Sequence, residues 1–128
     1  MAGKLQDKVA VITGAARGVG RCTALLMAQE GAKIVVADNG SSVDGSGGSL
    51  GPSEAVVDEI KSLGGEATAI ACDVSDWNQS KQLIDATIEK YGKLDILVNI
   101  AGNFRVNNIV NVTRDDWDAL RKVHMDGM

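Results

Sequence analysis

The chain has 128 residues, 45% of them apolar, which suffices for one domain with a buried core. Its formal charge of −4 and the lack of any lysine or arginine run argue against a nucleic-acid-binding protein. The apolar runs are too short to span a bilayer, and the N-terminal sequence MAGKLQDKVAV has no apolar signal core. We therefore expect a cytoplasmic protein that binds neither membranes nor nucleic acids.

Short apolar runs alternate with longer amphipathic stretches in the first third of the chain. Lys8–Gly14 and Ala32–Asp38 are apolar without strict alternation, which is typical of strands covered on both faces. Gly18–Glu30 lies between them and has the apolar spacing of a helix, with Gly31 as its stop. The inward positions predicted for this helix are Val19, Thr23, Leu26 and Met27.

The Gly/Ser-rich segment Asn39–Pro52 is predicted to be a surface loop and not an interdomain linker, because the same alternation resumes after it. A helix opens at Pro52 and Ser53 and is closed by the pair Gly64-Gly65. Its predicted inward stripe is Val56, Val57, Ile60 and Leu63.

The alternation continues with a third strand over Glu66–Asp73 and a helix that Ser75 can cap and that runs to Tyr91. Gly92 ends this helix, and Leu94–Gly102 is a fourth strand with its exit turn. The residues expected to face inward on the helix are Ile84, Ile88 and Tyr91.

A last helix is predicted from the capping-box spacing of Thr113 and Asp116, and Trp117–Met128 has the pattern of a helix that is still running at the end of the sequence. Its broad apolar face consists of Trp117, Leu120, Val123, His124 and Met128. Because this face needs a partner and strand four would be an open edge, we expect the isolated chain to be marginally stable, and a truncated product or fragment to be the simplest explanation.

Repeated strand–helix units predict parallel strands joined by right-handed crossovers. We therefore expect an α/β fold: an incomplete, Rossmann-type doubly wound parallel sheet of about four strands in the order 3-2-1-4, with helices on both faces. Cys22 and Cys72 have no metal-ligand spacing, so they are interpreted as two buried reduced thiols and no metal site is predicted.

The sequence VITGAARGVG carries the strongest chemical signal. Thr13 and Gly14 leave the first strand, and Gly18 and Gly20 open the next helix, so the backbone can turn tightly and approach a pyrophosphate. The helix N-terminus then offers free N–H groups and a positive dipole end to the anion. The alternative is an ordinary strand-to-helix turn without a ligand.

Asp38 ends the second strand 24 residues after Gly14, close to the spacing of about 20 residues expected for a carboxylate that binds the adenosine ribose. Such a carboxylate accepts hydrogen bonds from a free 2′-hydroxyl and repels a 2′-phosphate, which favours NAD over NADP. Arg17 could meet a 2′-phosphate, whereas Asn39 adds no positive charge beside Asp38. The alternative is a solvated aspartate at a strand end.

Together, TGAARGVG, Asp38, CDVSD and NIAG resemble the N-terminal half of a short-chain dehydrogenase/reductase, and the resemblance spans residues 1–128 as one domain half. It implies that Asp38 holds the adenosine ribose and that Asp73 and Val74 border the adenine. Ile100 stands where the family usually has an asparagine. The remaining residues implied to form the dinucleotide turn or lie beside the cofactor are Thr13, Gly14, Arg17, Gly18, Val19, Gly20, Asn99, Ala101 and Gly102.

The resemblance implies an NAD(P)-dependent oxidoreductase that interconverts a secondary alcohol and a ketone and forms a homo-oligomer when complete. The Gly/Ser loop and the sequence DDWDALRKVHMDG look most like (3R)-hydroxyacyl-CoA dehydrogenases, so a 3-hydroxyacyl thioester is one candidate substrate. Dehydrogenases of sterols or small cyclic alcohols are a second candidate group.

The catalytic groups that the resemblance implies, a Ser and a Tyr-x-x-x-Lys pair, are absent from this sequence. The only tyrosine, Tyr91, is followed four residues later by Asp95, and no serine occurs after Ser80. His124 occupies the position of a helix asparagine in the family, so it is either a catalytic candidate or a core histidine. We expect the 128-residue chain alone to be inactive; the alternative is a non-catalytic module that binds NAD or pairs with a partner.

Overall fold

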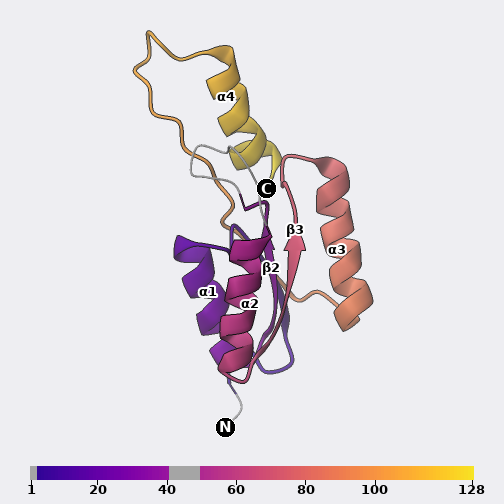
Figure 1. The fold of residues 1–128 in the computed structure, drawn as a ribbon. Helices are drawn as coiled ribbons and strands as arrows, with labels where there is room; N and C mark the ends of the chain where they lie inside the picture. The colour runs from indigo at the N-terminus through magenta and orange to yellow at the C-terminus, as the bar shows by residue number, and fades with distance from the viewer. Residues whose placement is uncertain (1–2, 41–49) are drawn as a thin grey trace.

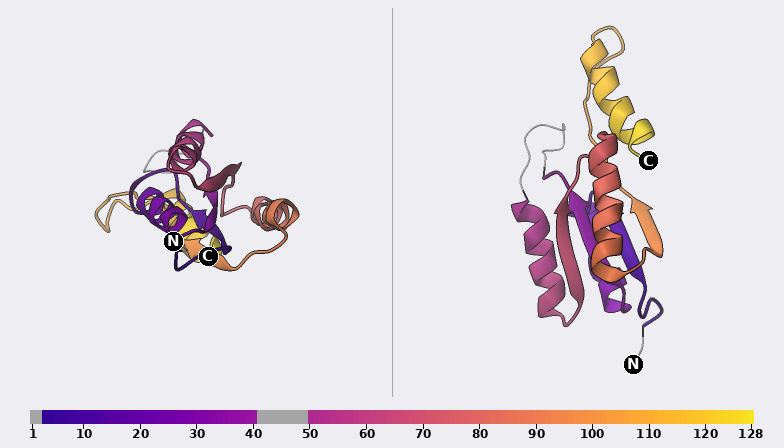
Figure 2. Two further views of the ribbon diagram at one scale, coloured as in Figure 1. Left: turned by 90° about the horizontal axis from the view of Figure 1, so that it is seen from below. Right: turned by 90° about the vertical axis from the view of Figure 1, so that its right-hand side faces the viewer.

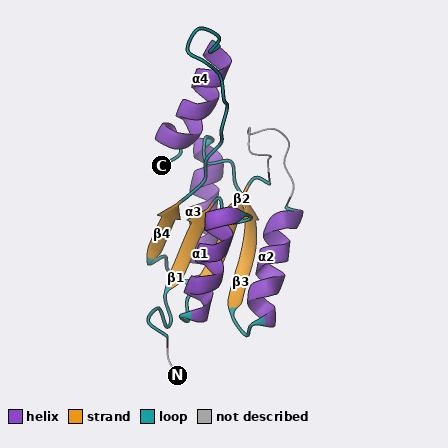
Figure 3. Cartoon of the chain, turned by 90° about the vertical axis from the view of Figure 1, so that its left-hand side faces the viewer, coloured by secondary structure: helices purple, strands orange, loops and turns teal. Residues whose placement is uncertain are grey.

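The computed structural model describes residues 3–40 and 50–128 and confirms the predicted architecture (Figure 1). Four parallel strands form one sheet in the order β3-β2-β1-β4. Figure 3 shows α1 and α2 on one face of this sheet and α3 on the other. The elements are β1 (Val9–Thr13), α1 (Gly18–Gln29), β2 (Lys33–Asp38), α2 (Gly51–Ser62), β3 (Glu66–Ala71), α3 (Trp77–Tyr91), β4 (Ile96–Asn99), α4 (Arg114–Arg121) and the π-helical turn η1 (Lys122–Asp126).

The two central strands are buried on both faces, as their unbroken apolar sequences predict. Ile12 and Ile34 pack with Ile60 on the side of α1 and α2, and all three are fully buried. On the opposite face, Val11 and Val35 belong to the cluster of Leu83 from α3, whose members are Val11, Val35, Ala37, Cys72 and Leu83. Burying each such side chain contributes about 1.5–3 kcal/mol, so the sandwich of helices fixes the position of β1 and β2.

The register brings the carboxyl ends of the strands to one edge, here called the carboxyl edge. Thr13 of β1 is paired with Ala37 of β2 on one side and with Asn99 of β4 on the other. In the part of the chain that the structure describes, β4 pairs only with β1, and Leu97 of β4 is exposed. The expected open edge at strand four is therefore confirmed.

The inward stripe predicted for α1 is partly wrong. Val19 is 72% exposed and Leu26 is also exposed, whereas Gly20 and Ala24 are the buried positions. A Cβ at Gly20 would overlap the carbonyl oxygen of Gly14, so α1 approaches the sheet through its small residues. Cys22 lies on the exposed side of this helix, which contradicts its interpretation as a buried thiol.

The face of α3 is shifted by one position from the prediction. Leu83 and Thr87 are its buried residues, whereas Ile88 is exposed, because the Thr87 hydroxyl can be buried while it donates to the carbonyl oxygen of Leu83. The N-cap is Asp76, whose side chain accepts a hydrogen bond from the backbone of Gln79, and not Ser75.

In α2, the predicted residues Val56, Val57 and Ile60 are buried, but Leu63 is exposed because it lies at the C-terminal cap. Most of the predicted loop Asn39–Pro52 falls on residues 41–49, which lie outside the described residues.

The last segment extends past the carboxyl edge, as Figures 1 and 2 show. The predicted capping box of Thr113 and Asp116 is confirmed at the start of α4. The helix does not run uniformly to the end, since it widens into η1 and Gly127 follows as a turn. Trp117 and Met128 are exposed. Among the described residues, no helix has the length and apolarity needed to cross a membrane.

Candidate dinucleotide site

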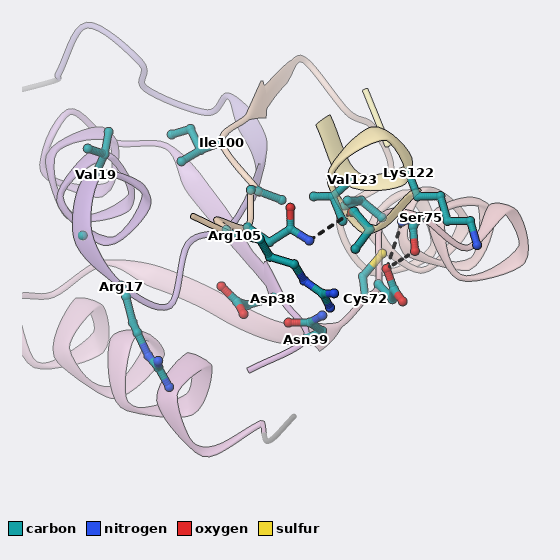
Figure 4. Close-up of a pocket in the computed structure, with 18 residues that line it drawn as sticks. Arg17, Val19, Asp38, Asn39, Cys72, Ser75, Ile100, Arg105, Lys122 and Val123 are labelled. Carbon is teal, nitrogen blue, oxygen red and sulfur yellow. Dashed lines mark hydrogen bonds between the residues drawn. The ribbon is translucent and has the colours of Figure 1, made fainter. Parts of the chain in front are cut away.

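A cavity of about 490 Å³ lies at the carboxyl edge, between the turns that follow the strands and the end of α4 (Figure 4). It lies where a doubly wound sheet changes strand order, the usual ligand position in such folds. The structure brings together nine of the predicted site residues in its wall: Gly14, Arg17, Gly18, Val19, Asp38, Asp73, Val74, Ala101 and Gly102. Thr13, Gly20, Asn99 and His124 are not among the lining residues.

The turn between β1 and α1 has the features that an anion site needs. Gly18 has φ +55°, and a Cβ there would meet nothing within 4 Å, so its backbone faces open space. Arg17 at the N-cap makes no side-chain hydrogen bond to the helix, so its side chain does not cap the first N–H groups of α1. Uncapped N–H groups at a helix N-terminus bind phosphate readily.

Close packing behind the turn depends on the other glycines and on Thr13. A Cβ on Gly14 would lie 2.8 Å from Cα of Ala101. The Thr13 hydroxyl accepts hydrogen bonds from the N–H groups of Ile100 at 3.1 Å and Ala101 at 3.2 Å. Thr13 is 4% exposed, so it acts on the cavity by holding the turn after β4 against the turn after β1.

Asp38 lines the cavity with a fixed carboxylate. Its Oδ2 accepts a hydrogen bond from the backbone N–H of Ala16 at 3.2 Å, and its Oδ1 accepts one from Gly40 at 2.7 Å. A carboxylate has about four lone-pair sites, so both oxygens can still accept from a ligand hydroxyl. The geometry is therefore suited to a ribose diol.

Asp73 shapes the opposite part of the cavity. Its Oδ1 accepts hydrogen bonds from both the N–H of Ser75 at 2.9 Å and the Ser75 hydroxyl at 2.6 Å. Neighbouring Cys72 is buried as predicted, and burial raises the pKa of its thiol, which therefore stays neutral. Ser75, predicted to be a helix cap, instead orders the Asp73 turn.

His124 lies against the backbone of the turn after β4. Its Nε2 is 2.8 Å from the carbonyl oxygen of Asn103, and a Cβ on Gly102 would lie 2.8 Å from its Cε1. Since the ring does not line the cavity, the structure favours a role in holding Gly102 and Asn103 over direct contact with a ligand.

Comparisons with known proteins give the family of the chain. A family model described as short chain dehydrogenase matches residues 8–128. The chain belongs to the short-chain dehydrogenase family. The members of this family are NAD(P)-dependent oxidoreductases, so the uncapped turn, Asp38 and the cavity they share fit a dinucleotide.

Three similar proteins illustrate this short-chain dehydrogenase kinship. The chain is 43% identical over 127 residues to peroxisomal multifunctional enzyme type 2 of Drosophila melanogaster, covering 98% of this chain and 21% of that protein. A short chain dehydrogenase from Mycobacterium avium is 44% identical with a TM-score of 0.88, and the match covers 98% and 43% of the two chains. One from Burkholderia cenocepacia, in complex with NADP, is 35% identical with a TM-score of 0.86, covering 98% and 48%. The chain thus spans less than half the length of these relatives.

Tyr91 does not supply the base that short-chain dehydrogenase chemistry needs. Burial, followed by the charge of Glu66, raises the pKa of Tyr91 to about 12. Its hydroxyl is buried with no hydrogen-bond partner among the described residues. A base works best with a pKa near the operating pH, so the interpretation of Tyr91 as a packing residue agrees with its place beside the core cluster of Val11 and Leu83.

Several cavity-lining residues of this short-chain dehydrogenase chain were not predicted from the sequence. Asn103 donates from Nδ2 to the carbonyl oxygen of Ala119 at 3.0 Å, and Arg105 forms an ion pair with Asp116. Both lie in an irregular loop, where no periodicity points to the inward side chains. No group of three potential metal-ligating side chains was found in residues 3–40 and 50–128.

Proposed function

We propose that this chain forms the cofactor-binding part of an NAD-dependent dehydrogenase that interconverts a secondary alcohol and a ketone. The observation that carries the proposal is one cavity shared by the uncapped N-terminus of α1 and the fixed carboxylate of Asp38. The helix end suits the diphosphate of a dinucleotide, and the carboxylate suits its adenosine ribose. Asp73 and Val74 would border the adenine.

Preference for NAD over NADP rests on the charge of Asp38. Its two oxygens are held by Ala16 and Gly40, so the carboxylate is not free to turn away from a 2′-phosphate. Like charges at short range in a partly buried site repel strongly. Asn39 contributes no positive charge, and Arg17 is an exposed residue at the rim. Arg105, which extends toward Asp38, is paired with Asp116. The NADP complex of the Burkholderia relative makes this preference worth testing directly.

A 3-hydroxyacyl thioester is the substrate that we favour, on the resemblance of the DDWDALRKVHMDG segment and the 43% identity to the Drosophila enzyme. The bound cofactor would accept or donate the hydride. This chain's own residues bind and orient the dinucleotide, and they include no Tyr-x-x-x-Lys pair. A homo-oligomeric complete form and a cytoplasmic location stay predictions.

The test measures binding of NADH and NADPH to the 128-residue chain by fluorescence titration. We expect NADH to bind more tightly, and Gly14→Val to abolish binding because the new side chain would collide with Ala101. Circular dichroism checks that the variant retains its helices. Equal affinity for the two cofactors would contradict the NAD preference, and unchanged binding by a folded Gly14→Val variant would contradict the site.

Catalysis is tested separately on the same preparation. We expect no alcohol-dependent reduction of NAD, because the chain has no catalytic Ser or Tyr-x-x-x-Lys pair. Detectable turnover would contradict the conclusion that catalysis needs these groups.

A partner-pairing module without catalysis is the second candidate function. It is favoured by the exposed Leu97 on the open edge of β4 and by the exposed Trp117 on α4. Reading the genomic DNA beyond codon 128 separates the two. A continuing frame with a serine and Tyr-x-x-x-Lys supports the enzyme, whereas a stop codon together with a stable expressed protein supports the module.

A further inference from the structure

Arg105 belongs to none of the motifs that identify the site, yet it lines the cavity. It leaves the loop between β4 and α4, and Figure 4 shows its side chain extending toward Asp38 and Asn39. Its Nη1 lies 3.3 Å from Oδ1 of Asp116, with about a third of the Arg105 side chain exposed. The cation therefore reaches across the cavity from the side opposite to β2.

Asp116 keeps this cation in place because its carboxylate is itself fixed. Its Oδ2 accepts a hydrogen bond from the N–H of Thr113 at 3.2 Å, while its own N–H donates to the Thr113 hydroxyl at 3.1 Å. Its hydrogen bonds, first to Thr113 and then to Arg105, hold the pKa of Asp116 below its usual value. The carboxylate of Asp116, which the backbone N–H of Thr113 holds, thus also anchors Arg105.

The strand order brings the loop that carries Arg105 to the same edge of the sheet as the phosphate turn. β4 is the neighbour of β1, and the Thr13 hydroxyl ties the two exit turns together. A dinucleotide with its ribose at Asp38 and its diphosphate at Gly18 would occupy the cavity that Arg105 also lines, with the Arg105 side chain extending toward Asp38 and Asn39. A guanidinium binds phosphate oxygens with paired hydrogen bonds.

The wall of the cavity carries charged side chains of both signs. Asp38 and Asp73 both contribute carboxylates to the wall, so two negative side chains face an anionic ligand. The N-terminus of α1 supplies only a partial positive charge. Arg17, Lys122 and Arg105 bring cationic side chains to the same wall, and the ion pair with Asp116 holds Arg105 in position.

We propose that Arg105 binds the diphosphate of the cofactor, opposite the N-terminus of α1. This inference rests on the proposed function and adds a positioning contact from outside the glycine-rich turn. Arg105 would recognise a phosphate group of the ligand. The 2′-phosphate of NADP is the alternative source of that group.

The experiment compares adenosine, ADP, 2′,5′-ADP and NADH as ligands of the 128-residue chain by calorimetry. Arg105→Gln should lower the affinity for ADP and NADH by about tenfold or more and leave adenosine binding unchanged. Arg105→Lys should lose less because it keeps the charge. The matched control is Arg114→Gln, which removes an exposed arginine paired with Asp118 on the same helix.

A second pair of variants separates positioning from helix capping. Asp116→Asn weakens both the cap and the hold on Arg105, whereas Thr113→Ala weakens only the cap. We expect ADP affinity to fall in Asp116→Asn and to be retained in Thr113→Ala.

Three outcomes would overturn the proposal: an unchanged ADP affinity in Arg105→Gln, an equal loss for adenosine, or a loss confined to 2′,5′-ADP. If the unsubstituted chain binds neither ADP nor NADH, the proposed function fails as well. If it binds both and Arg105→Gln has no effect, only this inference fails.

Discussion

The hydroxyl of Thr13 accepts a hydrogen bond from the backbone N–H of Ala101 at 3.2 Å and so connects two turns that are 88 residues apart in the sequence. The same oxygen accepts the N–H of Ile100 and lies 3.4 Å from the carbonyl oxygen of Val98, to which it can donate. One side chain thus satisfies the backbone at the exit of β4, where the strand ladder ends. The cavity wall formed by Gly14 and Ala101 depends on this connection.

Thr13→Val should destabilise the chain by about 1–3 kcal/mol, because it leaves buried N–H groups without an acceptor. Thr13→Ser keeps the hydroxyl and should be closer to the original stability. Urea unfolding followed by circular dichroism measures both. A valine variant as stable as the unsubstituted protein would show that the hydroxyl is not needed at this position.

Gly20→Ala should lower both stability and NADH affinity. The added Cβ would overlap the carbonyl oxygen of Gly14, so α1 must move away from the turn, at a cost of about 1–3 kcal/mol. Gly64→Ala is the control, since Gly64 has φ +85° and open space around it, far from the cavity. It should cost about 1–2 kcal/mol from its backbone conformation alone and leave NADH binding intact. Equal NADH affinities in the two variants would contradict the role of Gly20.

Asp38→Asn should shift cofactor choice toward NADP. The amide oxygen can still accept a hydrogen bond from Ala16 or Gly40, while the negative charge that repels a 2′-phosphate is gone. We expect weaker NADH binding and stronger NADPH binding in fluorescence titrations. Asp58→Asn removes the same charge from the exposed side of α2 and should change neither affinity. An unaltered ratio in Asp38→Asn would count against the ribose assignment.

Ionisation of Tyr91 should lower the free energy of unfolding of the chain at high pH. Its pKa is raised from 10.0 to about 12 in the folded chain, so between these values the unfolded chain releases the proton while the folded chain keeps it. Stability therefore falls as pH rises through this window. Tyr91→Phe should remove that loss and cost little at neutral pH, because the hydroxyl has no partner among the described residues. Since Tyr91 is the only tyrosine, its ultraviolet absorbance gives its pKa directly; a midpoint near 10 would contradict the raised value.

The sheet could be predicted from sequence because β1 and β2 are buried on both faces and must be apolar throughout. The helix faces were harder to predict. Leu26 is apolar yet exposed, while Gly20 and Thr87 are buried. In α1 and α3, side-chain size and local hydrogen bonds determine which positions contact the sheet. The spacing of apolar residues does not predict either of these.

The residues of the candidate site could also be predicted only in part. Gly14, Gly18 and Asp38 could be predicted because their chemistry depends on spacing along one strand–helix–strand unit. Arg105 and Asn103 could not, since they reach the cavity only through the path of the loop after β4. That path is fixed by tertiary contacts such as the pairing of Arg105 with Asp116.

The strand order β3-β2-β1-β4 also determines when the cavity can form. The contacts of β1 with β2 are local, but its contact with β4 joins Thr13 to Asn99, 86 positions later. Such distant pairing is slow to form and comes late during synthesis. Until the ribosome has released Ala101, one side of β1 is uncovered and the glycine-rich turn has no opposite wall. Nucleotide binding would therefore report that β4 has docked beside β1, and it would favour chains in which this pairing has formed.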